Sequence, residues 1–178
     1  MKNYAFDRNQ ILPAALSLPG LTLETPALTH VAGVDEVGRG PLAGPVVAAA
    51  VILQDAPRIR GLRDSKALTP LQREALFPEI QNRAVAFAVA IVEHHVIDAE
   101  NILQASLRAM RMALAQLSVH PHLVLVDGNQ KPHSGFPERT VIKGDTLSAA
   151  IMAASILAKV TRDRLMVQAH EKFPQYGF

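Results

Sequence analysis

Cysteine is absent from the 178 residues of this chain, which excludes disulfide bonds and thiolate-bound metals and is compatible with the reducing cytosol. The sequence also lacks any run of about 18 or more apolar residues free of charge, so it predicts no transmembrane span. Its first residues do not combine a basic start with a continuous apolar block, as a secretory signal would. From these absences we expect a cytoplasmic protein.

Aromatic residues are few as well, and the net charge is small. Aromatic residues make up 4% of a chain that is 49% hydrophobic, so aliphatic and alanine side chains must form most of the core. The formal net charge of +2 is too small to indicate a polyanionic partner by itself. The length fits one domain. Residues 11–18 can form a turn or two of helix, but we interpret residues 1–28, with scattered prolines, as a variable lead-in to a domain at 29–178.

Apolar runs bounded by turn residues predict the strands of a sheet. We expect strands at about residues 29–35, 46–53, 84–92, 122–127 and 139–143. A short glycine turn joins the first two, which favours an antiparallel pair. With helical stretches between and after the strands, the order of elements predicts a mixed α/β fold, a five-stranded mixed sheet flanked by helices.

Helix signals lie between these strands. Thr69 can cap a helix, Pro70 suits its first position and Gln72 completes a capping box, although we expect Pro78 to disturb or restart that helix. We expect Asp98 to cap a second helix, which carries an apolar stripe at spacings of three and four. An alanine-rich stretch predicts one long helix over about residues 146–170, able to approach a neighbouring element closely.

Four carboxylates follow apolar segments and adjoin turns that contain glycine: Asp35, Glu36, Asp127 and Asp145. Two carboxylates about 4 Å apart repel by roughly 1 kcal/mol in water and about 4 kcal/mol at an effective dielectric near 20. If the four converge, they must therefore take up protons or hold cations. Ligands that are all oxygen favour Mg²⁺ or Mn²⁺ over zinc. Two such ions can activate a water and stabilise the leaving oxygen in phosphodiester hydrolysis.

Each acid also has a structural interpretation. Asp35 and Glu36 can be ordinary turn residues, and neighbours on a regular strand point to opposite faces, so both reach one site only if the backbone bends there. Asp127 stands in a common turn pair with Gly128, and Asp145 is well placed to be a helix N-cap. The four acids together are stronger evidence for a metal site than any one of them alone.

Other motifs carry weaker signals. The glycines of residues 38–44 loosely resemble a dinucleotide fingerprint, but Pro41 and Pro45 interrupt the helix that such a site needs. We interpret the histidine pairs at 94–95 and at 120 and 122 as surface or strand-end residues, because spacing identifies no third ligand. The basic residues at positions 58, 60, 63 and 66 form a solvated loop, or a phosphate-contacting one if it lies near the acids.

Taken together, these motifs closely resemble the ribonuclease HII family in its bacterial form. The matching segments run in order along residues 31–178: VAGVDEVGRGPLAGP at 31–45, DSK at 64–66, NILQAS at 101–106, VDGN at 126–129, KGD at 143–145 and AASILAKVTRD at 153–163. The resemblance implies an RNase H-like fold and a divalent-metal endonuclease. It also implies RNA/DNA hybrids and ribonucleotide-containing DNA as substrates, cut on the 5′ side of a ribonucleotide to leave a 3′-hydroxyl and a 5′-phosphate.

The resemblance also implies roles for single residues. Asp35, Glu36, Asp127 and Asp145 would be the catalytic metal ligands, for Mg²⁺ or Mn²⁺ and two ions with substrate. The turn formed by Gly38, Arg39 and Gly40 would present its backbone to the 2′-hydroxyl that distinguishes RNA from DNA. Lys66 and Ser155 would contact phosphate or the strands, whereas Lys159 and Asp163 would pair on a helix surface.

The chain departs from the family pattern at its end. Family members usually continue past Phe-Pro-x-Tyr-Gly-Phe into a segment whose tyrosine stacks at the RNA–DNA junction, and Tyr176 is not its equivalent. We therefore expect this chain to lack the C-terminal part of the family domain, which would reduce junction selectivity and turnover. A binding module of the same fold with little catalysis, and a nuclease of that fold with another substrate, are the alternatives. We expect a monomer.

Overall fold

The computed structural model of the protein describes residues 2–16 and 30–178, with the backbone alone for residues 11–16. A single sheet of five strands forms its centre, in the order β3-β2-β1-β4-β5. Strand β2 is antiparallel to both β1 and β3, whereas β4 and β5 run parallel to β1. The strand bounds are β1 Val31–Val37, β2 Val46–Leu53, β3 Ala84–Val92, β4 Leu123–Asp127 and β5 Glu138–Val141. The mixed five-stranded sheet flanked by helices is confirmed, and the predicted second and third strands match residue for residue.

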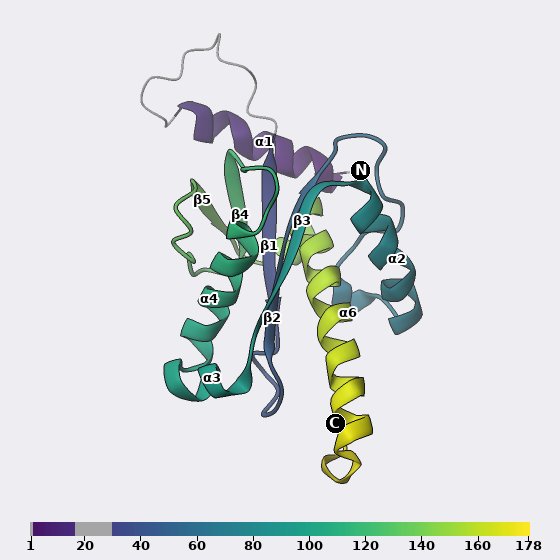
Figure 1. Cartoon of the computed structure of the whole chain (residues 1–178). Coiled ribbons are helices and arrows are strands. Elements are labelled where there is room, and N and C mark those ends of the chain that lie inside the picture. Colours follow the sequence, from purple (N-terminus) through teal and green to yellow (C-terminus); the bar gives the residue numbers. More distant parts are fainter. Residues whose placement is uncertain (1, 17–29) are drawn as a thin grey trace.

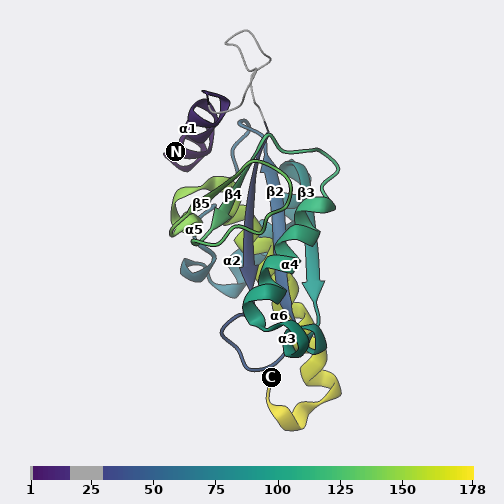
Figure 2. The same ribbon diagram turned by 90° about the vertical axis from the view of Figure 1, so that its left-hand side faces the viewer.

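Helices cover both faces of the sheet (Figure 1). On one face lies α4 (Ile102–Ala115), preceded by the short α3 (His94–Glu100), as Figure 2 shows from that side. On the other face lies α6 (Ala149–Lys172), with α2 (Pro70–Arg83) packed beside it. Alternate residues of β2 divide between the two layers, since Ala48 and Ala50 pack toward α4 while Val47 and Ala49 pack toward α6. None of the helices in the described part of the chain is long and apolar enough to cross a membrane.

Helix α6 lies against β1 with almost no space between the backbones. A Cβ atom built on Gly33 would lie 2.2 Å from the carbonyl carbon of Ala150 and from the nitrogen of Ile151. The alanines of this helix that face the sheet, Ala149, Ala150, Ala153, Ala154 and Ala158, are all buried. Small side chains on both partners therefore set the distance between helix and sheet, as the sequence predicts.

The helix boundaries differ from the predicted ones in three places. Helix α2 continues through Pro78 to Arg83, because the loss of one backbone hydrogen bond is outweighed by packing of its apolar side against α6. Asp98 lies inside α3, and Asn101 caps α4 instead by accepting from the Gln104 N–H. The C-terminal helical region is divided into α5 (Gly144–Leu147) and α6, because Ser148 adopts an extended conformation and caps the second helix.

The N-terminal segment forms a longer helix than its weak periodicity predicts. Helix α1 spans Lys2–Leu16 and lies across the end of the sheet where β1 begins (Figure 1). Tyr4 is buried, and its hydroxyl accepts a hydrogen bond from the Ile59 N–H at 3.1 Å. Asp7 is buried against the start of α6, where its Oδ2 accepts from the Ala150 N–H at 3.0 Å. Residues 17 and 18 of the predicted short helix lie outside the described residues, and the division at residue 28 stays a prediction.

Candidate active site

Strand β1 carries the first two carboxylates on opposite faces of the sheet. Asp35 pairs with Ala49 and Glu36 with Ala48, and the pairing with β2 continues regularly to Val37. Because Ala49 faces α6 and Ala48 faces α4, the two side chains leave the strand in opposite directions. The backbone bend considered from the sequence is therefore absent from β1, but the two acids still lie close together, since the charge of Glu36 acts on Asp35 and that of Asp127 acts on Glu36. Asp35 is buried, and the side chain of Glu36 is 13% exposed.

The other two carboxylates come from the end of β4 and from α5. Strand β4 lies parallel to β1, so Asp127 ends its strand beside the end of β1. Asp145 lies in the first turn of α5, where its backbone N–H donates to Asp127 Oδ1 at 3.2 Å. The N-cap position of α5 belongs to Lys143, so an N-cap role for Asp145 is wrong. Gly144 fits beside this contact, since a Cβ there would lie 3.1 Å from the same Asp127 oxygen.

The carboxylates lie close enough to perturb one another. Burial raises the pKa of Asp35 well above its usual value, and the negative charges of Glu36 and Asp127 raise it further. Burial also raises the pKa of Glu36, against the opposing effect of Arg39. The pKa of Asp127 is raised by burial and then by the charge of Asp145. The four acids thus form one electrostatic cluster, in which the ionised forms are costly without a cation.

Two basic side chains neutralise the outer members of the cluster. Lys66 Nζ lies 2.8 Å from Asp145 Oδ2, and this hydrogen bond raises the pKa of Lys66. Arg39 Nη1 lies 3.2 Å from Glu36 Oε1. Among the described residues, no Lys, Arg or His forms an ion pair with Asp35 or Asp127. The inner pair of acids therefore forms no ion pair, and of the basic side chains the more distant Lys66 acts on it, since its charge lowers the pKa of Asp127.

The donor set of the cluster fits a divalent cation in chemistry. All four side chains offer carboxylate oxygens, the ligands that Mg²⁺ and Mn²⁺ prefer, and the inner two form no ion pair with a described side chain. Within residues 2–10 and 30–178, however, no three His, Asp or Glu side chains stand ready to hold one ion. Since Lys66 and Arg39 hold Asp145 and Glu36 in ion pairs, a metal ion would require these outer side chains to turn.

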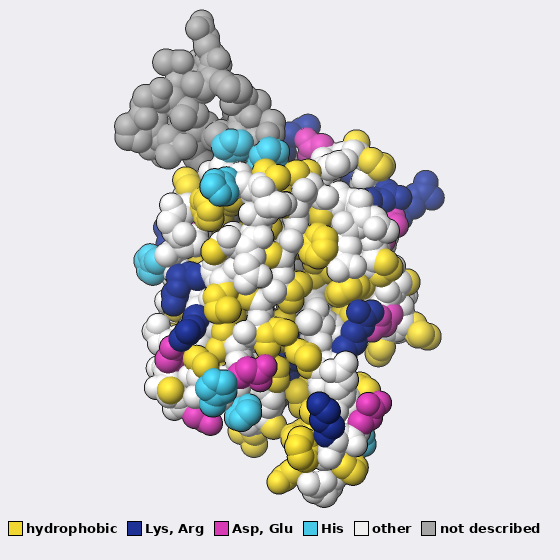
Figure 3. All heavy atoms as spheres, viewed as in Figure 1, with side chains coloured by type: hydrophobic (Ala, Val, Ile, Leu, Met, Phe, Trp, Pro, Cys, Tyr) yellow, Lys and Arg dark blue, Asp and Glu magenta, His cyan; other side chains and the backbone are white. Residues whose placement is uncertain are grey.

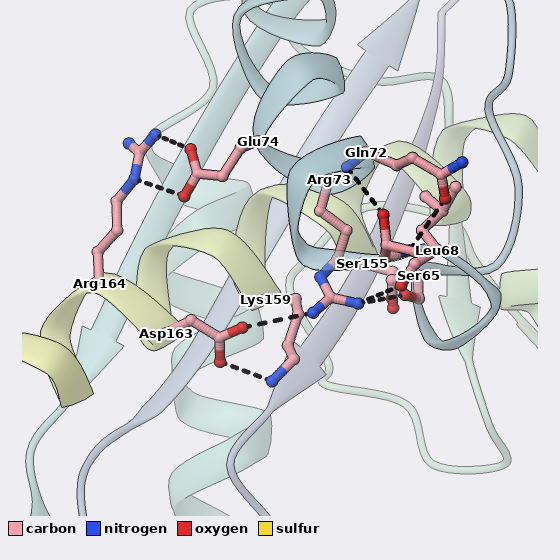
Figure 4. A network of polar contacts seen from close by, with 10 residues as sticks. Ser65, Leu68, Gln72, Arg73, Glu74, Ser155, Lys159, Asp163 and Arg164 are labelled. Carbon is pink, nitrogen blue, oxygen red and sulfur yellow. Dashed lines mark hydrogen bonds and ion pairs between the residues drawn. The ribbon is translucent and has the colours of Figure 1, made fainter.

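A network of polar contacts fixes the loop before α2 to α6 (Figure 4). Ser155 of α6 is buried, and its hydroxyl lies 2.8 Å from the Ser65 hydroxyl. The Ser155 hydroxyl also lies near Asp35 and lowers the pKa of that carboxyl. Arg73 of α2 donates to the Ser65 carbonyl at 2.9 Å. Ser155 thus lies beside Asp35 and Ser65, and Ser65 belongs to the motif at 64–66; the substrate contact expected of Ser155 stays a prediction.

The surface of α6 carries the second part of this network. Lys159 donates to Asp163 at 2.6 Å, which confirms the pair expected on the helix surface. Asp163 in turn lies 3.8 Å from Arg73 Nη2 (Figure 4). Arg164 forms an ion pair with Glu74 of α2. Helices α2 and α6 are therefore joined by charged side chains outside the apolar contact.

The turn expected to face the ribose belongs to a loop between β1 and β2, residues 38–45, called here the glycine loop. Gly38 is buried with φ +111°, whereas Gly40 is exposed and a Cβ there would meet nothing within 4 Å. Arg162 of α6 donates through Nε to the Pro45 carbonyl at 3.0 Å and through Nη2 to the Ala43 carbonyl at 2.8 Å. Sequence reasoning missed Arg162, although it lies in the matched segment at 153–163.

The other basic residues do not gather at the acids. Of the basic loop, Lys66 alone contacts a carboxylate of the cluster, while Arg58 lies over the ring of Tyr4 at 5.5 Å. On the face drawn in Figure 3 the Lys and Arg side chains are scattered. His94 and His95 are exposed at the start of α3, and the rings of His30 and His122 stack at 5.4 Å.

Comparison with known proteins identifies relatives of this chain over nearly all of residues 31–178. The family model of ribonuclease HII matches residues 32–178. The ribonuclease HII of Verminephrobacter eiseniae is 57% identical over 148 residues, which are 83% of this chain and 71% of that protein. The ribonuclease HII of Paracidovorax citrulli is 59% identical over 148 residues, again 83% of this chain and 62% of that protein.

A solved structure shares the fold. The crystal structure of the ribonuclease H2 from Pyrococcus horikoshii OT3 matches with a TM-score of 0.73 and 31% identity, over 81% of this chain and 77% of that one. The carboxylate cluster of this protein therefore stands on an RNase H2-type fold. Because the family model matches residues 32–178, from β1 to the last residue of the chain, this chain belongs to the ribonuclease HII family.

Proposed function

We propose that this protein is a metal-dependent endoribonuclease. Its substrates are RNA/DNA hybrids, whose RNA strand it hydrolyses, and duplex DNA with a single ribonucleotide, which it cuts on the 5′ side of that ribonucleotide. Membership of the ribonuclease HII family supports the reaction class. The observation that carries the proposal for this chain is Asp35, a buried carboxyl that forms no ion pair among the described residues and whose pKa is raised by burial and by the charges of Glu36 and Asp127. The cytoplasmic location and the monomeric state stay predictions.

We propose Asp35, Glu36, Asp127 and Asp145 as the residues that hold Mg²⁺ or Mn²⁺. When bound, such ions lower the pKa of a water and stabilise the leaving oxygen of a phosphodiester. Keeping Asp35 in a dry position costs folding stability, because its charged form is desolvated. A strained or desolvated group that survives in a site is commonly retained for function rather than for stability. The nearby Ser155 hydroxyl offsets part of this cost, since it lowers the pKa of Asp35.

The reaction is a hydrolysis with no other reactant. The oxygen of a water molecule bonds to phosphorus, and the bond from phosphorus to the 3′-oxygen of the preceding nucleotide breaks. The 3′-oxygen takes a proton to become a 3′-hydroxyl, and the ribonucleotide keeps the 5′-phosphate. The carboxylates would position the reacting groups. With cations bound, Asp35 would stay ionised and bind a cation through its oxygens instead of a proton.

Selection of a ribonucleotide falls to the glycine loop. Gly40 is exposed and has open space around its Cβ position, so a sugar can approach its backbone closely. The 2′-hydroxyl is donor and acceptor at once, which lets backbone groups tell RNA from DNA. Lys66 stands at the edge of the cluster with its side chain 79% exposed, and we propose that it turns from Asp145 to a substrate phosphate.

The test uses a DNA duplex with one ribonucleotide and an all-DNA duplex as control, with Mg²⁺, Mn²⁺ or a chelator. We expect metal-dependent cutting on the 5′ side of the ribonucleotide. Asp35→Asn should lose activity by at least the roughly 10–100-fold that even outer-shell changes cost a metal site. The same variant should unfold no more easily than the original protein, because it removes a desolvated charge.

Asp98→Asn is the matched control, since Asp98 is an exposed acid on α3. It should cut as the unchanged protein does. Cutting of the all-DNA duplex would refute ribonucleotide selection. Equal cutting with and without chelator would refute the metal-dependent reaction. Binding of the duplex without any cutting would leave a nucleic-acid-binding module of the same fold as the better description.

A further inference from the structure

Resting on the proposed function, we infer that Arg162 is a positioning residue that holds the glycine loop in the shape that selects the ribose. Arg162 lies on α6 and is 6% exposed. It forms no ion pair with any described Asp or Glu side chain. Its hydrogen bonds go instead to two carbonyl oxygens at the end of the glycine loop, those of Ala43 and Pro45.

The burial of Arg162 needs an explanation. A guanidinium group is costly to remove from water, and burial lowers the pKa of Arg162. Buried charges are usually paired with an opposite charge, and here two neutral carbonyls take that place. A buried charge of this kind usually stabilises the fold less than an apolar side chain of similar size would. It does fix the carbonyls in direction, because the guanidinium donors form a rigid planar fork.

The loop is built around this guanidinium. A Cβ on Gly38 would lie 2.8 Å from Arg162 Nε, and a Cβ on Gly44 would lie 3.2 Å from its Nη2. Both glycines have positive φ, +111° and +89°, so a side chain at either position would be strained as well as obstructed. Met166 completes the enclosure, since its Sδ would lie 2.4 Å from a Cβ on Gly44. The glycines at both ends of the loop thus make room for Arg162.

The same helix supports the reacting carboxylate. Ser155, whose hydroxyl lowers the pKa of the nearby Asp35, stands seven residues before Arg162, close to two helical turns, so both side chains leave α6 on the same side. Helix α6 therefore sets the position of Asp35 and the position of the glycine loop together. A shift of the loop by about 1 Å is enough to cost on the order of 100-fold in rate, even when the mutation lies away from the chemistry.

The first test measures the loop without any cleavage. Hydrogen exchange of backbone amides is compared in the unchanged protein, Arg162→Ala and Arg162→Lys. We expect exchange over residues 38–45 to become faster in Arg162→Ala, while the amides of β2 keep their protection. Unchanged exchange over residues 38–45 in Arg162→Ala would overturn the inference. This readout does not depend on activity, so it separates a failure of the inference from a failure of the proposed function.

The second test measures selection. On the duplex with one ribonucleotide, we expect Arg162→Ala to lose about 100-fold in kcat, while the KM and the binding of an all-DNA duplex change little. Arg162→Lys should recover part of the loss, because a single ammonium can bond one of the two carbonyls at a time. Arg164→Ala is the matched control, an arginine on the same helix that pairs with Glu74 on the surface.

The outcomes are separable even if one variant folds poorly. If Arg162→Ala unfolds, Arg162→Lys must still show faster exchange over residues 38–45 and a lower kcat than Arg164→Ala. If Arg162→Lys instead matches Arg164→Ala in both, Arg162 has no positioning role. Should the unchanged protein fail to cut at all, the proposed function fails, and the exchange experiment alone decides whether Arg162 holds the loop.

Discussion

Asp7 gives the clearest prediction about stability, because a buried carboxyl joins α1 to the start of α6. It is 8% exposed, its Oδ2 accepts from the Ala150 N–H, and its Oδ1 is buried with no hydrogen-bond partner among the described residues. Burial raises the pKa of Asp7 to about 6 from its usual 3.8, although the nearby Ser148 hydroxyl and the amides of Ala150 and Ala149 oppose the rise. Folding therefore favours the protonated form of this side chain.

The raised pKa of Asp7 makes the free energy of unfolding depend on pH, with a direction and size that follow from proton linkage. A carboxyl whose pKa is higher in the folded state contributes stability that is fully present below the unfolded pKa and is lost as the pH rises through the folded pKa. A difference of about 2 pH units corresponds to about 3 kcal/mol in the free energy of unfolding. Most of this, about 2 kcal/mol, should be lost between about pH 4.5 and about pH 7.5.

Asp7→Asn removes the titrating group and keeps an oxygen for the Ala150 N–H. We expect the free energy of unfolding, measured with urea, to fall by about 2 kcal/mol more for the unchanged protein than for Asp7→Asn as the pH rises across this range. Asp35, Glu36 and Asp127 also have raised pKa values, but they are common to both proteins and cancel in the difference. Asp98→Asn serves as the control and should run parallel to the unchanged protein. Parallel curves for Asp7→Asn as well would refute the reasoning.

Three further predictions concern packing, capping and the support of Asp35. Gly33→Ala should lower the free energy of unfolding by about 3 kcal/mol or more, because its Cβ would meet the α6 backbone; a change of under about 1 kcal/mol in urea unfolding would contradict the observed contact. Thr69→Ala should cost about 1 kcal/mol by removing the capping box of α2, with cleavage unchanged, and Ser118→Ala on the surface is its control. Ser155→Ala should raise the Mg²⁺ concentration needed for half-maximal cleavage by about 10-fold, whereas an unaltered metal requirement would exclude a supporting role for this hydroxyl.

The strands and the acids were predictable because their signals are local. The apolar runs at β2 and β3 are continuous and end at turn residues, so the strand bounds follow directly from the sequence. Asp127 was found for the same reason, since it follows the apolar run of β4. The direction of Glu36 was harder, because the choice between a bent and a regular strand depends on the pairing with β2, which the sequence does not contain.

The parts that were missed depend on partners distant in the sequence. Helix α1 has little periodicity, and the contacts of Tyr4 and Asp7 go to Ile59 and Ala150. Arg162 has the appearance of an ordinary surface residue on a helix, since its partners are carbonyl oxygens, which every residue has and which no sequence pattern marks. Only the placement of α6 against the glycine loop shows that this arginine is buried.

Helix α6 connects these observations, since one rigid element sets the positions of three parts of the site. Near its start it lies directly on β1 at Gly33, in its middle Ser155 lies beside Asp35, and further along Arg162 donates to the glycine loop. Each residue of a helix turns by about 100°, so a slip of α6 by one residue would remove both the serine and the arginine from their partners. The close contact at Gly33 opposes such a slip, because a Cβ on that residue would overlap the backbone of α6 and shift the helix. We therefore expect Gly33, two residues before Asp35 on β1, to help keep that acid and the glycine loop aligned with each other.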